Sequence, residues 1–193
     1  MKCSVFIATS LDGYIATPDG DVDWLDTCGK QGVDLGDDAD MGFSELMASV
    51  DCLIMGRNTL EKLASFGLTA ETWPYGDVKV IGLSRTLKTL PAGFAGLGDI
   101  KNNIELFAGS IPKLIEKLEQ QGLSHAYIDG GAVVTSFLKL KLIDDVCITL
   151  APVLLGKGIR LFGEMGDSIQ LEKASSKVFA NDFVQVRYNV EYL

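Results

Sequence analysis

The chain has 193 residues, of which 47% are hydrophobic and 22% charged, and its formal net charge is −9 at pH 7. A chain of this length can bury roughly 70% of its unfolded surface, so we expect one domain, residues 1–193, that needs neither a disulfide nor a metal staple. The acidic balance argues against nucleic-acid and anionic-membrane binding, which depend on clustered Lys and Arg, and no apolar run approaches the ~18 residues of a membrane span.

The amino-terminal segment predicts a buried strand followed by a long acidic loop. The strand covers Lys2 to Thr9, and its continuous run Val5-Phe6-Ile7-Ala8 is typical of a strand buried on both faces. A turn centred on Asp12-Gly13 follows it. Between Asp19 and Asp40 the sequence has eight carboxylates and one lysine around Trp24. Loops of this length without structure of their own are usually functional lids or disordered.

The acidic loop contains a pattern that resembles the start of a calcium site. Asp19, Asp21 and Asp23 alternate as the oxygen ligands of a helix–loop–helix calcium site do. However, Trp24 stands where that site requires Gly, and Lys30 stands where a bidentate Glu should close the cage. We therefore predict no metal site.

The segment from Ala39 to Ser49 predicts an amphipathic helix with Phe43, Leu46 and Met47 on one side. Asp40 falls at its start, where the helix dipole favours a carboxylate. The residues leave two interpretations of this acid open. It is either only an acid of the first turn, or a functional acid in an apolar pocket that binds a ring N–H and supplies or relays a proton.

The stretch from Asp51 to Leu63 predicts a buried strand, Cys52 to Met55, that ends in a turn at Gly56 and feeds a helix. The first N–H groups of such a helix have no intrahelical partners and point, with the positive end of the helix dipole, beyond the sheet edge. Arg57 adds a cation and Thr59 a hydroxyl, so a phosphate could bind there. The alternative is a plain strand-to-helix corner with an exposed arginine.

Two later strands are predicted to end in similar chemistry. Val78 to Leu83 runs into Ser84-Arg85-Thr86, which presents a hydroxyl and a guanidinium. His125 to Ile128 runs into Asp129-Gly130-Gly131-Ala132, and a glycine pair at such a turn lets a backbone approach a pyrophosphate closely. Because the carboxyl ends of parallel strands form the ligand crevice of such sheets, we expect the three anion sites to lie together.

A short strand and a helix are predicted between these two strand ends. The strand covers Ile104 to Phe107. The helix begins at Ser110, which suits an N-cap, has Pro112 in its first turn and closes at Gly122. The alternation of strands and helices in this part of the chain indicates a mostly parallel sheet.

The carboxyl-terminal part predicts three more strands. Val146 to Leu155 contains Pro152, which suggests an edge strand or a bulge. A glycine-rich loop follows, in which Lys157 and Arg160 either hold a substrate phosphate or are simply solvated. No crossover helix separates the last two strands, which cover residues 169–179 and 183–192, so they should form an antiparallel hairpin added to the sheet.

Five ordered motifs, which span nearly the whole chain, resemble those of the dihydrofolate reductase-like superfamily, and most closely the reductase domain of the bifunctional riboflavin-biosynthesis deaminase-reductase. They are Ser10-x-Asp12-Gly13-x-Ile15-Ala16, Met55-Gly56-Arg57-x-Thr59-x-Glu61, Leu83-Ser84-Arg85-Thr86, Asp129-Gly130-Gly131-Ala132, and Leu142-Ile143-Asp144-Asp145 with Pro152 to Gly158 and Leu161-Phe162. The zinc deaminase signature is absent and the chain has one His, so the resemblance covers the reductase half alone. It implies a three-layer α/β/α fold, with a mostly parallel central sheet and a C-terminal antiparallel hairpin, and NADPH laid along the strand ends.

Carried over by position, the resemblance implies a cofactor site made of residues from four parts of the chain. The nicotinamide would be flanked by Ala8 and Ile15. Phosphates would be bound by Gly56, Arg57 and Thr59, and the pyrophosphate by Gly130, Gly131 and Ala132. The adenosine 2′-phosphate would meet Ser84 and Arg85, with Leu83 beside them. Counting back from Arg57, Asp40 falls where the catalytic acid of dihydrofolate reductases is expected. Trp24 and Gly156 are placed at the substrate, although Trp24 could instead only anchor its loop.

The sequence thus predicts a stand-alone NADPH-dependent reductase that transfers hydride to a C=N or carbonyl group of a pterin-like or pyrimidine-ribose-like small molecule. The alternative is a nucleotide- or pterin-binding sensor or carrier without turnover. Members of this family are often homodimers, and the strand around Pro152 or the final hairpin could supply the contact. The four cysteines form no C-x-x-C pair and the amino-terminal apolar run is too short for a signal peptide, which predicts a cytoplasmic protein.

Overall fold

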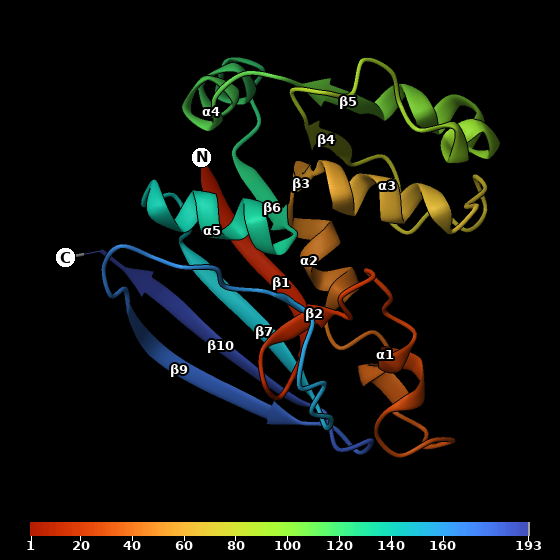
Figure 1. Cartoon of the computed structure of the whole chain (residues 1–193), viewed down its shortest axis with the longest axis vertical. Helices are drawn as coiled ribbons and strands as arrows, with labels where there is room; N and C mark the ends of the chain where they lie inside the picture. The colour runs from red at the N-terminus through yellow and green to blue at the C-terminus, as the bar shows by residue number, and fades with distance from the viewer. Residues whose placement is uncertain (193) are drawn as a thin grey trace.

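The computed structural model describes residues 1–192, which form an eight-stranded sheet in the order β5-β4-β3-β6-β1-β7-β10-β9 (Figure 1). The first six of these are mutually parallel, whereas β10 runs antiparallel to β7 and β9 antiparallel to β10. The strands are β1 (Lys2–Ser10), β3 (Cys52–Gly56), β4 (Lys79–Leu83), β5 (Ile104–Phe107), β6 (His125–Asp129), β7 (Asp145–Ala151), β9 (Gln170–Val178) and β10 (Val184–Glu191), and a separate two-stranded sheet pairs β2 (Tyr14–Ala16) with β8 (Ile159–Arg160). The predicted parallel sheet with a C-terminal hairpin is confirmed.

Helices cover both faces of the sheet, as the predicted three-layer fold requires. They are α1 (Trp24–Thr27), η1 (Gly36–Asp38), α2 (Phe43–Ser49), α3 (Arg57–Ser65), η2 (Ala92–Asn103), α4 (Ile111–Gln120) and α5 (Gly131–Lys139). Side chains of α4 and α5 pack in one apolar cluster, and those of α2, α3 and η2 pack in a second. Within residues 1–192, no helix is both long and apolar enough to cross a membrane.

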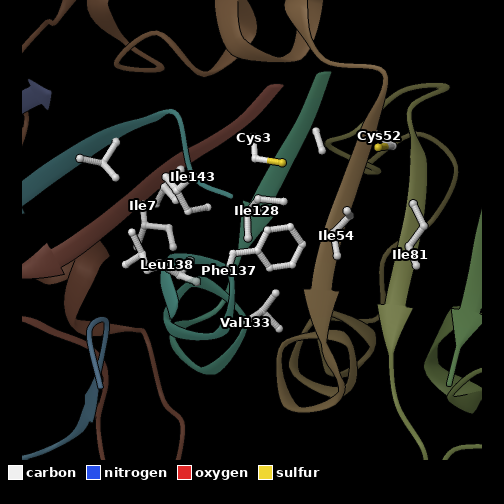
Figure 2. Close-up of a cluster of buried hydrophobic side chains, with 14 of the residues drawn as sticks. Cys3, Ile7, Cys52, Ile54, Ile81, Ile128, Val133, Phe137, Leu138 and Ile143 are labelled. Atoms are coloured by element: carbon white, nitrogen blue, oxygen red, sulfur yellow. The ribbon is translucent and has the colours of Figure 1, made fainter. Parts of the chain in front are cut away.

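The first apolar cluster joins α5 to the middle of the sheet. Figure 2 shows Phe137 of α5 beside Ile128 of β6, with Ile54 of β3 close to them. Phe137 is fully buried, and truncation of a buried Phe to Ala typically costs 3–5 kcal/mol. This packing fixes where α5 begins relative to the end of β6, and therefore where its N-terminal N–H groups point.

The structure differs from the sequence-based expectation at three places. The helix predicted from Ala39 begins only at Phe43, because the Asp40 carboxylate caps it from outside. The strand predicted to run to Leu155 ends at Ala151, before Pro152, and lies between β1 and β10, so the expectation of an edge strand or bulge there is wrong. The 3₁₀ segment η2 was not predicted, since its three glycines interrupt its apolar pattern.

Candidate active site

The carboxyl ends of the parallel strands border a cavity of about 780 Å³, a volume typical of small-molecule sites. All eleven residues that the resemblance placed around the cofactor line this cavity: Ala8, Ile15, Gly56, Arg57, Thr59, Leu83, Ser84, Arg85, Gly130, Gly131 and Ala132. The expectation that separate strand ends meet at one rim is therefore correct as geometry. Whether these residues bind NADPH stays a prediction.

Three helices of nine or ten residues begin at this cavity and leave their first N–H groups open to it. The N-cap residues of α3, α4 and α5 are Gly56, Ser110 and Gly130, and none of them makes a side-chain capping bond among the described residues. Each helix start carries roughly half a positive charge from its dipole. The cavity is therefore suited to an anion that spans several strand ends, such as a chain of phosphates.

The glycine pair allows the start of α5 to pack closely against α3 on one side and against β8 on the other. Gly130 has φ of +88°, and a Cβ there would lie 2.4 Å from the Thr59 hydroxyl oxygen. A Cβ on Gly131 would lie 2.3 Å from the carbonyl oxygen of Arg160. Packing alone thus requires glycine at both positions, and it brings the two helix starts together.

Two arginines at the cavity differ in how they are held. Arg57 donates from Nη1 to the Thr86 hydroxyl at 3.3 Å and lies 3.6 Å from the Glu61 carboxylate, so its guanidinium bridges two strand ends. Arg85 is exposed and makes no ion pair or hydrogen bond among the described residues. The buried hydroxyl of Ser84 accepts the N–H groups of Thr86 and Leu87 and so shapes the turn that presents Arg85. Arg85 is therefore a cation free for a ligand.

A clasp of hydrogen bonds holds the other end of the cavity, where Ala8 and Ile15 lie. The Asp12 carboxylate accepts hydrogen bonds from the Ser10 hydroxyl at 2.6 Å and from the N–H groups of Leu155 and Gly156 at 3.1 and 2.7 Å. Two motifs that lie far apart in the sequence are thus one structural unit. Gly156 belongs to this clasp and lines neither cavity described here, so the structure gives no support to its predicted contact with the substrate.

Asp129 is a cavity residue to which the sequence assigned no role. It ends β6, and its Oδ1 accepts the N–H of Gly130 at 2.7 Å. Burial raises the pKa of the Asp129 carboxyl to about 6, although the Gly130 hydrogen bond opposes the rise. Tyr75 and Tyr127 line the same region, and Tyr127 donates its hydroxyl hydrogen to the Phe6 carbonyl at 2.8 Å. A carboxyl with this pKa can carry a proton near neutral pH, and the signal that could have identified it is an acid directly before the glycine pair.

A second cavity of about 460 Å³ adjoins the first and contains Asp40. The Asp40 side chain is exposed, and its oxygens accept the N–H groups of Gly42 and Ser44, each at 2.9 Å. Hydrogen bonds, first from the Ser44 side chain and then from these N–H groups, hold the pKa of Asp40 below its usual value. Of the two interpretations of Asp40, the structure favours the capping one, because both carboxylate oxygens accept backbone N–H groups at the start of α2. The catalytic role of Asp40 has no support beyond position.

Trp24, Lys157 and Arg160, which the sequence placed or considered near the substrate, line neither of the two cavities. Trp24 is buried against Ala151, Phe179 and Phe183, which matches the alternative of a loop anchor rather than a stacking lid. Arg160 lies over the Tyr14 ring, 4.9 Å from its centroid, and donates to the Tyr14 hydroxyl at 3.2 Å. Neither Arg160 nor Lys157 lines either of the two cavities described here, so the phosphate role considered for them has no support from these cavities.

Comparison with known proteins identifies the family. The family model described as the RibD C-terminal domain matches residues 2–185. This chain belongs to the RibD C-terminal domain family. The family assignment agrees with the resemblance drawn from the five motifs, and it covers all residues of both cavities.

The chain is also similar to individual proteins over nearly its whole length. The chain is 33% identical to the uncharacterized protein YwjB of Bacillus subtilis, with 97% of both chains covered, and 26% identical to YyaP of the same organism. A protein of Shewanella sp. PV-4, provisionally assigned to riboflavin biosynthesis, has a similar structure, with a TM-score of 0.84 and 39% identity over both whole chains. The riboflavin biosynthesis reductase Rib7 of Saccharomyces cerevisiae shares the fold, with a TM-score of 0.63 and 16% identity over 98% of this chain and 90% of that one. The dihydrofolate reductase-like fold is confirmed.

Proposed function

We propose that this protein is an NADPH-dependent reductase that transfers hydride to a C=N or carbonyl group of a pterin-like or pyrimidine-ribose-like small molecule. The observation that carries the proposal is one cavity that contains both groups for binding anions and a titratable carboxyl, Asp129, directly before the turn at Gly130. Membership of the RibD C-terminal domain family, and a fold shared with Rib7, which is named a riboflavin biosynthesis reductase, support the same reaction class.

The residues of the first cavity fit a dinucleotide phosphate in three regions. Arg85, presented by the Ser84 turn, would bind the 2′-phosphate, because its guanidinium has no competing partner among the described residues. The starts of α3 and α5 would bind the pyrophosphate with open N–H groups. The backbone near Ala8 and Ile15 would border the nicotinamide. NADPH would supply the hydride, and the protein would bind and orient both reactants.

Asp129 would supply the proton that accompanies hydride transfer. Its carboxyl is protonated in a substantial fraction of molecules near pH 6, so it can donate to the nitrogen or oxygen that gains charge during the reaction. Tyr127 cannot easily do this, because its hydroxyl hydrogen is held by the Phe6 carbonyl and burial raises its pKa well above the usual value. Burial among the apolar side chains that line the same region is what raises the pKa of this carboxyl.

The experiment is NADPH oxidation, followed by absorbance, against a panel of pterins, flavin precursors and carbonyl compounds. We expect turnover with at least one compound, and we expect Asp129→Asn to lower kcat by about 10²-fold or more while the Kd for NADPH changes little. Tight binding of NADPH without oxidation of any compound, and without an effect of Asp129→Asn, would instead identify a sensor or carrier.

We also propose that the protein is a cytoplasmic homodimer that pairs through the C-terminal hairpin. β9 is the edge strand of the sheet, drawn in blue in Figure 1, and it is exposed along its whole length. Its Val178 side chain is 70% exposed, and an open edge of this kind can pair with a second chain. The four cysteines are free thiols, as expected in a reducing compartment. Sedimentation of wild type and of Val178→Lys tests the dimer, since the charge should separate the subunits.

A further inference from the structure

We propose that the second cavity holds the ring of a substrate without phosphate or carboxylate groups, and that the Thr149 hydroxyl donates a hydrogen bond to an acceptor atom of that ring. This inference rests on the proposed reductase function and specifies its substrate class. The second cavity adjoins the first through Phe6, Ala8 and Leu25, which line both. A ring in it would therefore lie beside the place proposed for the nicotinamide, between apolar side chains that include Leu35 and Phe183.

The charges of the second cavity oppose an anionic substrate. Asp26 and Asp40 line it, and its one lysine, Lys30, is paired with Asp182 at 3.0 Å. The loop from Asp19 to Asp40 that forms its wall has eight carboxylates and one lysine. Asp21 and Asp38 of this loop are paired with Lys62 and Lys177, but Asp26 and Asp40 have no ion-pair partner among the described residues, so a phosphate group in the cavity would meet their negative charge. Charge repulsion of this kind excludes wrong ligands as effectively as good contacts select right ones.

The first cavity shows that the chain places cations where it binds anions. Arg57, Lys62 and Arg85 line that cavity together with three helix starts. The charged side chains that line the two cavities are therefore of opposite sign, although the cavities share part of their walls. The cations once considered for a substrate phosphate, Lys157 and Arg160, line neither cavity, so neither of them extends the positive region into the second cavity.

A buried network determines what the second cavity offers to an uncharged ring. Arg187 donates from Nε and Nη2 to Oε1 of Gln185, at 3.2 and 3.1 Å. Because a guanidinium only donates hydrogen bonds, the amide oxygen of Gln185 must face Arg187 and its NH₂ group must point the other way. The Gln185 Nε2 group then donates to the Met41 carbonyl at 2.9 Å and to Oγ1 of Thr149 at 3.0 Å. The hydroxyl oxygen of Thr149 therefore accepts a hydrogen bond from the Gln185 side chain.

This network gives the hydroxyl hydrogen of Thr149 no acceptor. Thr149 is only 4% exposed and lines the second cavity, and no acceptor for its hydrogen is present among the described residues. A buried hydroxyl usually donates its hydrogen to an acceptor, because an unpaired buried donor destabilises the protein. A carbonyl oxygen or an unprotonated ring nitrogen of a ligand would satisfy it. Gln185 and Arg187 are thus positioning residues, and Thr149 is the group that touches the substrate.

The test measures binding of matched compounds to protein saturated with NADP⁺, so that the cations of the first cavity are occupied. The pairs are uridine, riboflavin and 5-amino-6-ribosylaminouracil, each with and without its 5′-phosphate, titrated by calorimetry. We expect at least one plain compound to bind and its phosphate to bind at least about tenfold more weakly. A phosphate that binds as tightly as its plain partner would overturn the proposal, and so would the failure of every compound to bind at about 1 mM.

Variants separate the charge from the hydroxyl. Asp26→Asn with Asp40→Asn, which retains a capping side chain, should raise the affinity of the phosphate relative to its plain partner several-fold. Thr149→Val should weaken the plain compound about 2- to 10-fold, whereas Thr149→Ser should restore it. Gln185→Glu keeps a partner for Arg187 but accepts the Thr149 hydrogen, so it should cause a similar loss that does not add to that of Thr149→Val. An unchanged affinity in Thr149→Val would refute the role of the hydroxyl.

Failure of the reductase proposal would be recognised separately. If NADP⁺ itself does not bind, the cofactor assignment is wrong, and titration of the same pairs into the cofactor-free protein still tests the second cavity. If NADP⁺ binds but the phosphates bind as well as the plain compounds, only the substrate class is wrong.

Discussion

Replacement of Arg85 by Ala should weaken NADPH and leave NADH almost unchanged. The guanidinium is exposed at the rim of the first cavity and has no partner among the described residues, so its removal breaks nothing in the free protein. The binding free energy that is lost then equals the contribution of the contact with the 2′-phosphate. A hydrogen bond to a charged group contributes about 1.5–3 kcal/mol. Since 1.4 kcal/mol corresponds to a factor of ten, the Kd for NADPH should rise about 10- to 100-fold.

The assay is direct titration of each dinucleotide into wild type and three variants. Arg57→Ala should weaken both dinucleotides alike, because the pyrophosphate is common to them. Lys88→Ala, an exposed cation three residues beyond Arg85 that does not line the cavity, serves as the control and should change neither. Equal losses for NADPH and NADH in Arg85→Ala would show that Arg85 does not bind the 2′-phosphate.

Three further predictions concern other parts of the structure. Asp129→Asn should stabilise the protein by roughly 1–3 kcal/mol at pH 8, because a raised carboxyl pKa makes the folded state lose stability as pH rises through about 6; the gain should vanish below about pH 4, and a constant difference between the two unfolding curves would contradict the assigned pKa. Gly130→Ala should destabilise by more than about 1 kcal/mol, because φ is +88° and the new Cβ would meet Thr59; calorimetric melting of this variant, with and without Thr59→Ala, should show partial rescue by the second change, and no rescue would mean that the clash is not the cause. Asp51→Ala should cost about 1–3 kcal/mol in denaturant unfolding, since its carboxylate accepts two N–H groups and the Ser124 hydroxyl, yet it should not alter the Kd for NADPH because it lies at the opposite end of the strands; an altered Kd would refute that separation.

The sequence predicted the parts of the fold that local patterns determine. The strand Ile104–Phe107 was placed at its observed bounds, and the strand–glycine–helix unit at Gly56 appeared as expected, because an apolar run, a glycine and a helical period are all local signals. The meeting of the strand ends at one cavity also followed, since parallel strands must present their carboxyl ends on one side.

The parts that were missed depend on tertiary surroundings. Asp40 and Asp129 both lie within two residues of a glycine, but hydrogen bonds, first from the Ser44 side chain and then from backbone N–H groups, lower the pKa of Asp40, whereas burial raises the pKa of Asp129. Neither effect can be read from neighbouring residues. The hydrogen bond of Thr149 comes from Gln185 of the adjacent strand β10. The role of Thr149 in the second cavity therefore depends on the pairing of β7 with β10, which the local sequence does not show.

The most direct test of the account is a crystal structure of the protein with NADP⁺. We predict that the dinucleotide lies along the strand ends, with its 2′-phosphate at Arg85, its pyrophosphate between the turns at Gly56 and Gly130, and its nicotinamide beside Ala8. A dinucleotide bound elsewhere on the molecule, or a first cavity that stays empty at saturating NADP⁺, would contradict the central claim.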